Sequence, residues 1–146
     1  MKSIPELIES AAKLPRPAND WRPMTDDFGA RLAQRLDGLM RAETTIDTLV
    51  PIKKRGLMRE NHRNHMKYMD SMVELFNPTL FVETVIWAMN TYRNHGFAIG
   101  YWKIMIPHCI ELMRKFGSKR NQHVISYYQW IMDNMDSLAK HSAPKK

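Results

Sequence analysis

The pattern that most constrains this chain runs from Leu57 to Gly96, where two helices are predicted on either side of Asn77-Pro78. In the first helix, apolar and imidazole side chains recur at steps of three and four residues, which is the spacing of one helix face. These side chains are Met58, His62, His65, Met69, Met72 and Phe76. The second helix, Thr79 to His95, is apolar around most of its circumference, as is typical of a central helix.

Amphipathic helical spacing continues on both sides of this pair, and no alternating strand pattern occurs. Further helices are predicted from Ile4 to Lys13, Asp26 to Val50, Ala98 to Phe116 and Lys119 to Lys140. The sequence therefore predicts an all-α, single-domain bundle of about six helices. Its predicted parts are an N-terminal helix and Pro-rich arm (1–24), which Trp21 anchors, the bundle itself (25–140) and a basic tail (141–146).

The composition excludes several classes of protein. Hydrophobic residues make up 44% and charged residues 25% of the chain, which is a globular composition and not a disordered one. No apolar run is long enough to span a membrane, and the N-terminus lacks the apolar core of a signal peptide. The single cysteine, Cys109, excludes an internal disulfide and suits a reducing compartment. A cytoplasmic protein without membrane association is expected.

The formal net charge is +7, which favours anionic partners. Two basic clusters lie at the predicted starts of helices, where free backbone amides could help bind a phosphate or carboxylate. They are Lys53, Lys54 and Arg55 in one cluster and Lys119 and Arg120 in the other. The alternative is that these cations belong to solvated loops. Nucleic-acid binding is also kept open, although no reader motif accompanies the basic residues.

The residues with the strongest potential for ligand chemistry lie on the His/Met face. His62 and His65 with Met69 would offer two imidazole nitrogens and a thioether, a set that suits copper(I) or a haem iron. The alternative is that both histidines are ordinary core residues bonded to the protein itself. The sequence does not identify a cofactor, and haem or another tetrapyrrole is the candidate. Met72, Trp87 and Tyr92 complete the predicted ligand-binding set.

Two tryptophans lie among polar side chains on their helices. Trp87 shares a strip with Glu83 and Asn90, and Trp130 shares one with His123 and other polar residues. Each ring is an interface anchor, a pocket wall or a ring covered by the N-terminal arm. No nucleophile elbow, Gly-rich phosphate loop or paired carboxylates can be found, so the protein is predicted not to be an enzyme.

The run from Phe76 to Trp87, followed by Arg93-Asn94-His95-Gly96, resembles a segment of bacterial helical sensor domains. Those domains precede cobalamin-binding or STAS-type output domains and resemble globins without haem. The resemblance implies a globin-like arrangement of helices and a sensor role exercised through a partner protein. Thr84 stands where the family usually has tyrosine, and the resemblance assigns no ligand-binding residues.

The sequence is therefore compatible with three functions. The leading one is a non-enzymatic sensor or regulatory module with a small apolar or tetrapyrrole ligand between the two central helices. Its 12 methionines would give an adaptable core, and Lys53, Lys54 and Arg55 would receive ligand carboxylates or an acidic partner. The second is a protein-interaction or structural module without a ligand, with homodimerisation through exposed aromatic faces. The third is a basic nucleic-acid-binding protein.

Overall fold

The computed structural model describes residues 1–16, 21–71, 76–118 and 122–144. These residues form eight α-helices, one short 3-10 helix and no strand, which confirms the all-α class. The helices are α1 (Ile4–Ala11), α2 (Asp26–Arg41), α3 (Ile46–Leu49), η1 (Ile52–Lys54), α4 (Arg55–Ser71), α5 (Pro78–Asn94), α6 (Gly100–Phe116), α7 (Gln122–Asp133) and α8 (Met135–His141).

The expected number of about six helices is too low because two predicted helices are each divided. The first, predicted from Asp26 to Val50, ends at Arg41 and restarts as α3. Thr44 and Thr45 lie in the break, where their β-branched side chains disfavour helix continuation. The second is divided at Asn134, whose side-chain amide donates to the Trp130 carbonyl at 2.8 Å. Such a local side-chain bond competes with the helical ladder.

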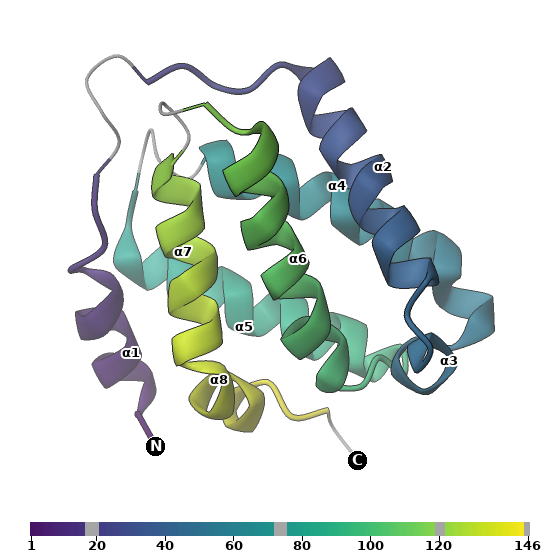
Figure 1. The fold of residues 1–146 in the computed structure, drawn as a ribbon. Coiled ribbons are helices and arrows are strands. Elements are labelled where there is room, and N and C mark those ends of the chain that lie inside the picture. Colours follow the sequence, from purple (N-terminus) through teal and green to yellow (C-terminus); the bar gives the residue numbers. More distant parts are fainter. Residues whose placement is uncertain (17–20, 72–75, 119–121, 145–146) are drawn as a thin grey trace.

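All eight α-helices of the described residues contribute side chains to one cluster of buried hydrophobic residues. Figure 1 shows how the helices are arranged. Helices α6 and α7 pack side by side, and α4 and α5 run behind them at a steep angle. Helix α2 packs against α4 and α6, while α1 packs against α5 at the other edge. Helix α6 contains Pro107 and runs through it as one helix.

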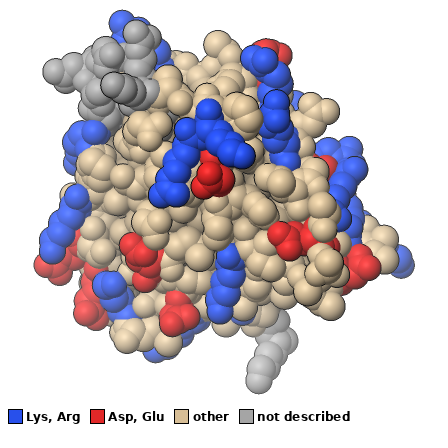
Figure 2. Space-filling model, in the orientation of Figure 1, with Lys and Arg blue, Asp and Glu red and all other residues tan. Residues whose placement is uncertain are grey.

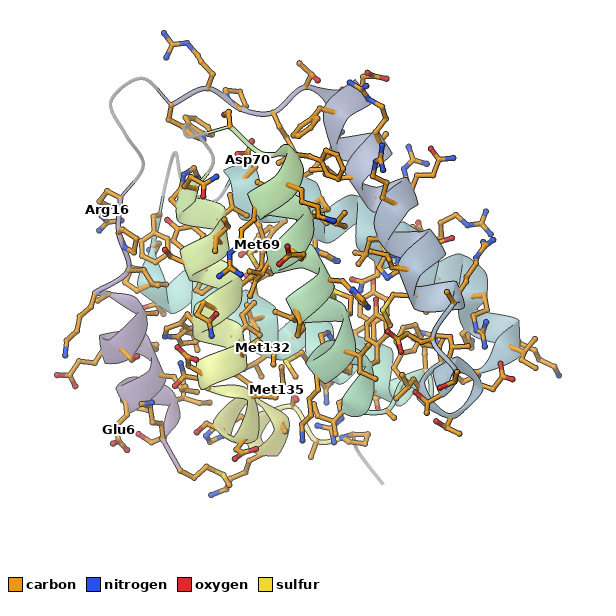
Figure 3. All side chains as sticks on the ribbon, in the orientation of Figure 1. Glu6, Arg16, Met69, Asp70, Met132 and Met135 are labelled. Carbon is orange, nitrogen blue, oxygen red and sulfur yellow. The ribbon has the colours of Figure 1, made fainter. Side chains whose placement is uncertain are left out.

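The N-terminal arm is held against the body, as the presence of Trp21 predicts. The Trp21 indole N–H donates to Asp70 at 3.4 Å, and the backbone N–H of Met24 donates to the same carboxylate at 2.6 Å. The Trp21 ring also lies edge-on to His123, with 6.4 Å between the ring centroids. Asp70 is 2% exposed and lies close to the arm that leads to α2 (Figure 3).

The residues that carry the resemblance to sensor domains have structural tasks in this fold. Asn77 caps α5 by accepting the Leu80 N–H at 3.1 Å, and Pro78 begins the helix. Arg93 donates to the Ala139 carbonyl of α8 at 2.7 Å. Gly96 has φ +96°, and a Cβ there would lie 2.9 Å from Pro51 Cγ. This part of the motif therefore fixes the ends of α5 and the position of α8.

In the described part of the chain, no helix has both the length and the apolar character needed to cross a membrane. On the face shown in Figure 2, Lys and Arg side chains are scattered among Asp and Glu side chains. Cys109 is buried as a free thiol, and burial raises its pKa above the ordinary range. It is therefore an unreactive core residue.

Candidate functional site

A cavity of about 270 Å³ lies between α4 and α5, with α6 and α7 beneath it. The α4 side chains around it are those of Asn61, Asn64, His65, Tyr68 and Met69. Those from α5 are Thr84, Val85, Trp87, Ala88, Met89 and Tyr92. The remaining wall residues are Trp102, Met105 and Ile106 of α6 and Tyr128 and Ile131 of α7.

The helical repeat explains why a space remains here. His65, Tyr68 and Met69 are three and four residues apart, so α4 presents a row of long side chains. Across from them, Thr84 and Ala88 are four residues apart and present short side chains from the same face of α5. Long side chains opposite short ones that do not fill the gap leave a hollow between the two helices.

The wall of the cavity carries no Asp, Glu, Lys or Arg among its lining residues. A ligand charge placed inside would be buried without a counter-charge, which is strongly unfavourable. The polar groups of the lining side chains are amides, hydroxyls, indole N–H groups and one imidazole. Burial raises the pKa of Tyr68, an effect that the Thr84 hydroxyl partly offsets. The cavity therefore suits an uncharged molecule with a largely apolar body.

His65 is the polar side chain most closely tied to this cavity. Its Nδ1 lies 2.9 Å from the Tyr128 hydroxyl, and burial raises the pKa of that tyrosine well above its usual value. Burial also lowers the pKa of His65 to about 4, so the imidazole is neutral at pH 7. The other groups near the Tyr128 hydroxyl are the Met66 thioether at 3.6 Å and the Cys109 thiol, and sulfur is a weak acceptor in both. Tyr128 therefore donates to Nδ1.

This bond has a consequence for the other ring nitrogen. Because Nδ1 accepts a hydrogen bond, the single proton of the neutral ring is on Nε2. His65 Nε2 is buried and has no hydrogen-bond partner within the described part of the chain. An unsatisfied buried donor of this kind is unfavourable by about 1–3 kcal/mol.

His62 occupies a different environment, although the sequence places it on the same helix face. It is fully buried and does not line the cavity. Its ring stacks on Tyr101 with a centroid distance of 6.0 Å, and its Nδ1 is 3.5 Å from Asp37 Oδ1. Burial, with a smaller effect from His65, lowers the pKa of His62 to about 3. His62 is thus buried in the core, although neither of its ring nitrogens has a hydrogen-bond partner within the described part of the chain.

Of the six predicted ligand-binding residues, the structure therefore brings four together around one cavity. They are His65, Met69, Trp87 and Tyr92. Met69 is buried within the bundle behind α6 and α7 (Figure 3). His62 lies outside this group, and Met72 lies outside the described residues.

Metal binding and tetrapyrrole binding find little support in this geometry. Within the described ranges, no three His, Cys, Asp or Glu side chains are grouped so that they could hold a metal ion. Pockets for drug-sized ligands measure roughly 300–1,000 Å³, and an engineered apolar cavity of about 150 Å³ binds benzene. At about 270 Å³, this cavity matches a compound of one or two rings.

The first basic cluster lies away from the cavity. Lys53, Lys54 and Arg55 do not line it. Arg55 is also engaged internally, because it donates to Asp47 at 2.5 Å and to the Val50 carbonyl at 3.4 Å. Anion binding by this cluster stays a prediction. The second cluster, Lys119 and Arg120, lies outside the described residues.

The two polar-strip tryptophans differ in exposure. Trp87 is 67% exposed and stands at the cavity wall. Trp130 is 6% exposed, and its indole N–H donates to Ser10 Oγ of α1 at 3.1 Å. Trp130 is therefore covered by the N-terminal helix and is not a surface anchor, whereas Trp87 is available at the surface.

Sequence reasoning missed several wall residues, notably Tyr68, Thr84 and Ala88. A usable signal existed for the last two, because short side chains four residues apart interrupt an otherwise bulky helix. The contribution of α6 and α7 could not be foreseen, since helical periodicity does not reveal which helices face each other.

Compared with known proteins, the chain matches no family model, no curated protein and no solved structure.

Proposed function

We propose that this protein is a non-enzymatic sensor module that binds a small ligand whose uncharged, mainly aromatic body lies in the cavity between α4 and α5. Ligand binding would be transmitted to a protein partner. The resemblance of the Phe76–Trp87 segment to sensor domains points in the same direction. The observation that carries the proposal is the cavity of about 270 Å³, whose wall holds no charged side chain.

The composition of the wall supports an aromatic ligand. Tyr68, Trp87, Tyr92 and Trp102 contribute rings, and Met69, Met89 and Met105 contribute thioethers. Ring–ring and sulfur–ring contacts favour flat, polarisable molecules. Methionine side chains also change rotamer easily, so the cavity can adapt to ligands of somewhat different shape. The buried Nε2–H of His65 would select a ligand with a hydrogen-bond acceptor.

The proposed signal arises at α5, because this helix contributes both to the cavity wall and to the surface. Trp87 belongs to both, and Leu80, seven residues earlier on the same face, is 52% exposed. A ligand that contacts Trp87 would shift the balance between orientations of its ring. A partner bound over Leu80 and Trp87 would detect that change.

Titration calorimetry with indole tests the proposal. Indole has nine non-hydrogen atoms, so a Kd of the order of 0.1–1 mM is expected. Ala88→Leu places a branched side chain in the cavity and should weaken binding at least tenfold. Gln34→Leu, at an exposed α2 position that does not line this cavity, is the control and should bind as the unaltered protein does. Equal binding by the two variants would refute the site.

A second function is favoured by the exposure of Trp87 and Leu80, which suits an interaction module without a ligand. In that case the protein would self-associate through the outer face of α5. Sedimentation analysis should then show a concentration-dependent dimer that Trp87→Ala weakens. A monomer at all concentrations would eliminate homodimerisation.

A further inference from the structure

A second hollow lies next to the cavity, on the other side of α4. It measures about 360 Å³ and is formed between α2 and α4, which pack against each other at the edge of the bundle (Figure 1). From this hollow we infer that the ligand is amphipathic, with an aromatic body in the cavity and a zwitterionic head, of the α-amino-acid type, in the α2–α4 hollow. This inference rests on the proposed function.

Asn64 connects the two spaces, since its side chain lines both of them. It is exposed on α4, with Glu60 one turn before it and Lys67 one turn after it on the same side of the helix. A group attached to a ring in the cavity would thus pass Asn64 and enter the hollow. The amide of Asn64 offers both donors and an acceptor to such a group.

The hollow differs from the cavity in its charge. It is lined by two cations, Arg63 and Lys67, and by two acids, Asp26 and Glu60. Lys67 Nζ is 2.8 Å from Asp26 Oδ1, so these two form an ion pair across the hollow, and Lys67 lowers the pKa of Asp26.

The other two charged residues are not paired in this way. Neither Arg63 nor Glu60 has an ion-pair partner among the residues that the structure describes. An unpaired cation and an unpaired anion therefore face one hollow. The ammonium of a zwitterion would meet Glu60 while its carboxylate meets Arg63, which can bind a carboxylate through two parallel hydrogen bonds. A head group with a single charge would instead be attracted by one of these two residues and repelled by the other.

Small residues on α2 keep the hollow open. Gly29 and Ala30 form its α2 wall. A Cβ at Gly29 would lie 3.4 Å from Met24 Sδ and 4.0 Å from Lys67 Cγ, so this wall has ordinary packing and no strain. A side chain larger than alanine at either position would extend into the space that the head group needs.

Four compounds with the same ring test the inference by calorimetry: indole, indole-3-propionate, tryptamine and tryptophan. Tryptophan should bind roughly five- to tenfold more tightly than indole at low ionic strength, while the two singly charged compounds should stay within about twofold of indole. High salt should reduce the advantage of tryptophan, because the hollow is open to solvent.

Three exposed α4 residues supply matched variants. Arg63→Gln and Glu60→Gln should each remove most of the advantage of tryptophan without changing the affinity for indole. Arg59→Gln, also exposed but lining neither space, should leave all four affinities unchanged. All three substitutions are on the surface, so unchanged circular dichroism will show that the fold is kept.

The outcomes separate this inference from the proposed function. If all four compounds bind equally, or if a singly charged compound binds most tightly, the inference is overturned while the cavity proposal stands. A tryptophan advantage that survives both Arg63→Gln and Glu60→Gln overturns it as well. If none of the four binds, the proposed function fails together with the inference.

Discussion

Acidification should destabilise this protein through His62 and His65, whose imidazoles are largely withdrawn from water. The pKa values of His62 and His65 are lowered to about 3 and about 4 in the folded state. In the unfolded chain both return to about 6.5, so below pH 6.5 the unfolded state binds more protons. Stability is therefore full above pH 6.5 and falls as the pH decreases toward 4. Each pH unit in this window changes the unfolding free energy by about 1.4 kcal/mol per histidine.

From pH 7 to pH 5 the expected loss is about 2 kcal/mol for each histidine and roughly 3–4 kcal/mol for the pair. Urea unfolding followed by circular dichroism at the two pH values, at constant ionic strength, measures it. His65→Gln should approximately halve the loss, because one of the two buried groups no longer titrates. His95→Gln, at an exposed histidine, is the control and should leave the loss unchanged.

The reasoning would be refuted if stability were the same at both pH values, or if His62→Gln and His65→Gln each left the loss intact. The opposite result has a physical route, because Asp37 Oδ1 lies 3.5 Å from His62 Nδ1 and could pair with a protonated imidazole. A protonated His62 paired with that carboxylate would make the protein insensitive to pH, or more stable in acid. Arg41, which binds the other oxygen of Asp37 at 2.9 Å, works against such a pair by competing for the carboxylate.

Three substitutions test the account of the fold. Leu36→Ala removes a fully buried side chain of α2 and should lower the unfolding free energy by about 2–5 kcal/mol in urea titrations; a loss below 1 kcal/mol would contradict its place in the core. Asn77→Ala removes the α5 cap and should reduce stability by about 1 kcal/mol, with faster amide exchange at Leu80 and no change at α7. Gly96→Ala should reduce the unfolding free energy by at least about 1–2 kcal/mol, because φ is +96° and Pro51 is close; an unchanged thermal midpoint would show that the turn adjusts freely.

The helical class and the position of the central pair could be predicted because they depend on local spacing. The steps of three and four residues from Met58 onward identify the buried face of α4, and the Asn77-Pro78 pair marks the start of α5. The breaks at residues 42–45 and at Asn134 were missed. Both breaks have local causes, the β-branched side chains of Thr44 and Thr45 and the Asn134 side-chain bond, which the apolar periodicity of the flanking residues does not reveal.

The site depends on both local and long-range information. Periodicity groups His62 with His65, and their rings do meet edge to face with 6.0 Å between centroids. Only His65 lines the cavity, however, because Tyr101 and Asp37 approach His62 from other helices. The short side chains at Thr84 and Ala88 signal a gap only once the facing helix is known. Likewise, nothing local indicates that α1 covers Trp130 while Trp87 stays exposed. Charge partners such as Asp26 for Lys67 also depend on how helices pack.

The central claim, a ligand cavity between α4 and α5, is tested most directly by an amide NMR titration with indole. The account predicts saturable shifts concentrated at Thr84, Ala88 and Tyr92 of α5 and at His65 of α4, and no such shifts in the Ala88→Leu variant. Amides of exposed α2 residues such as Ala30 should not move. No shift at saturating indole, or shifts confined to surfaces away from α4 and α5, would contradict the account.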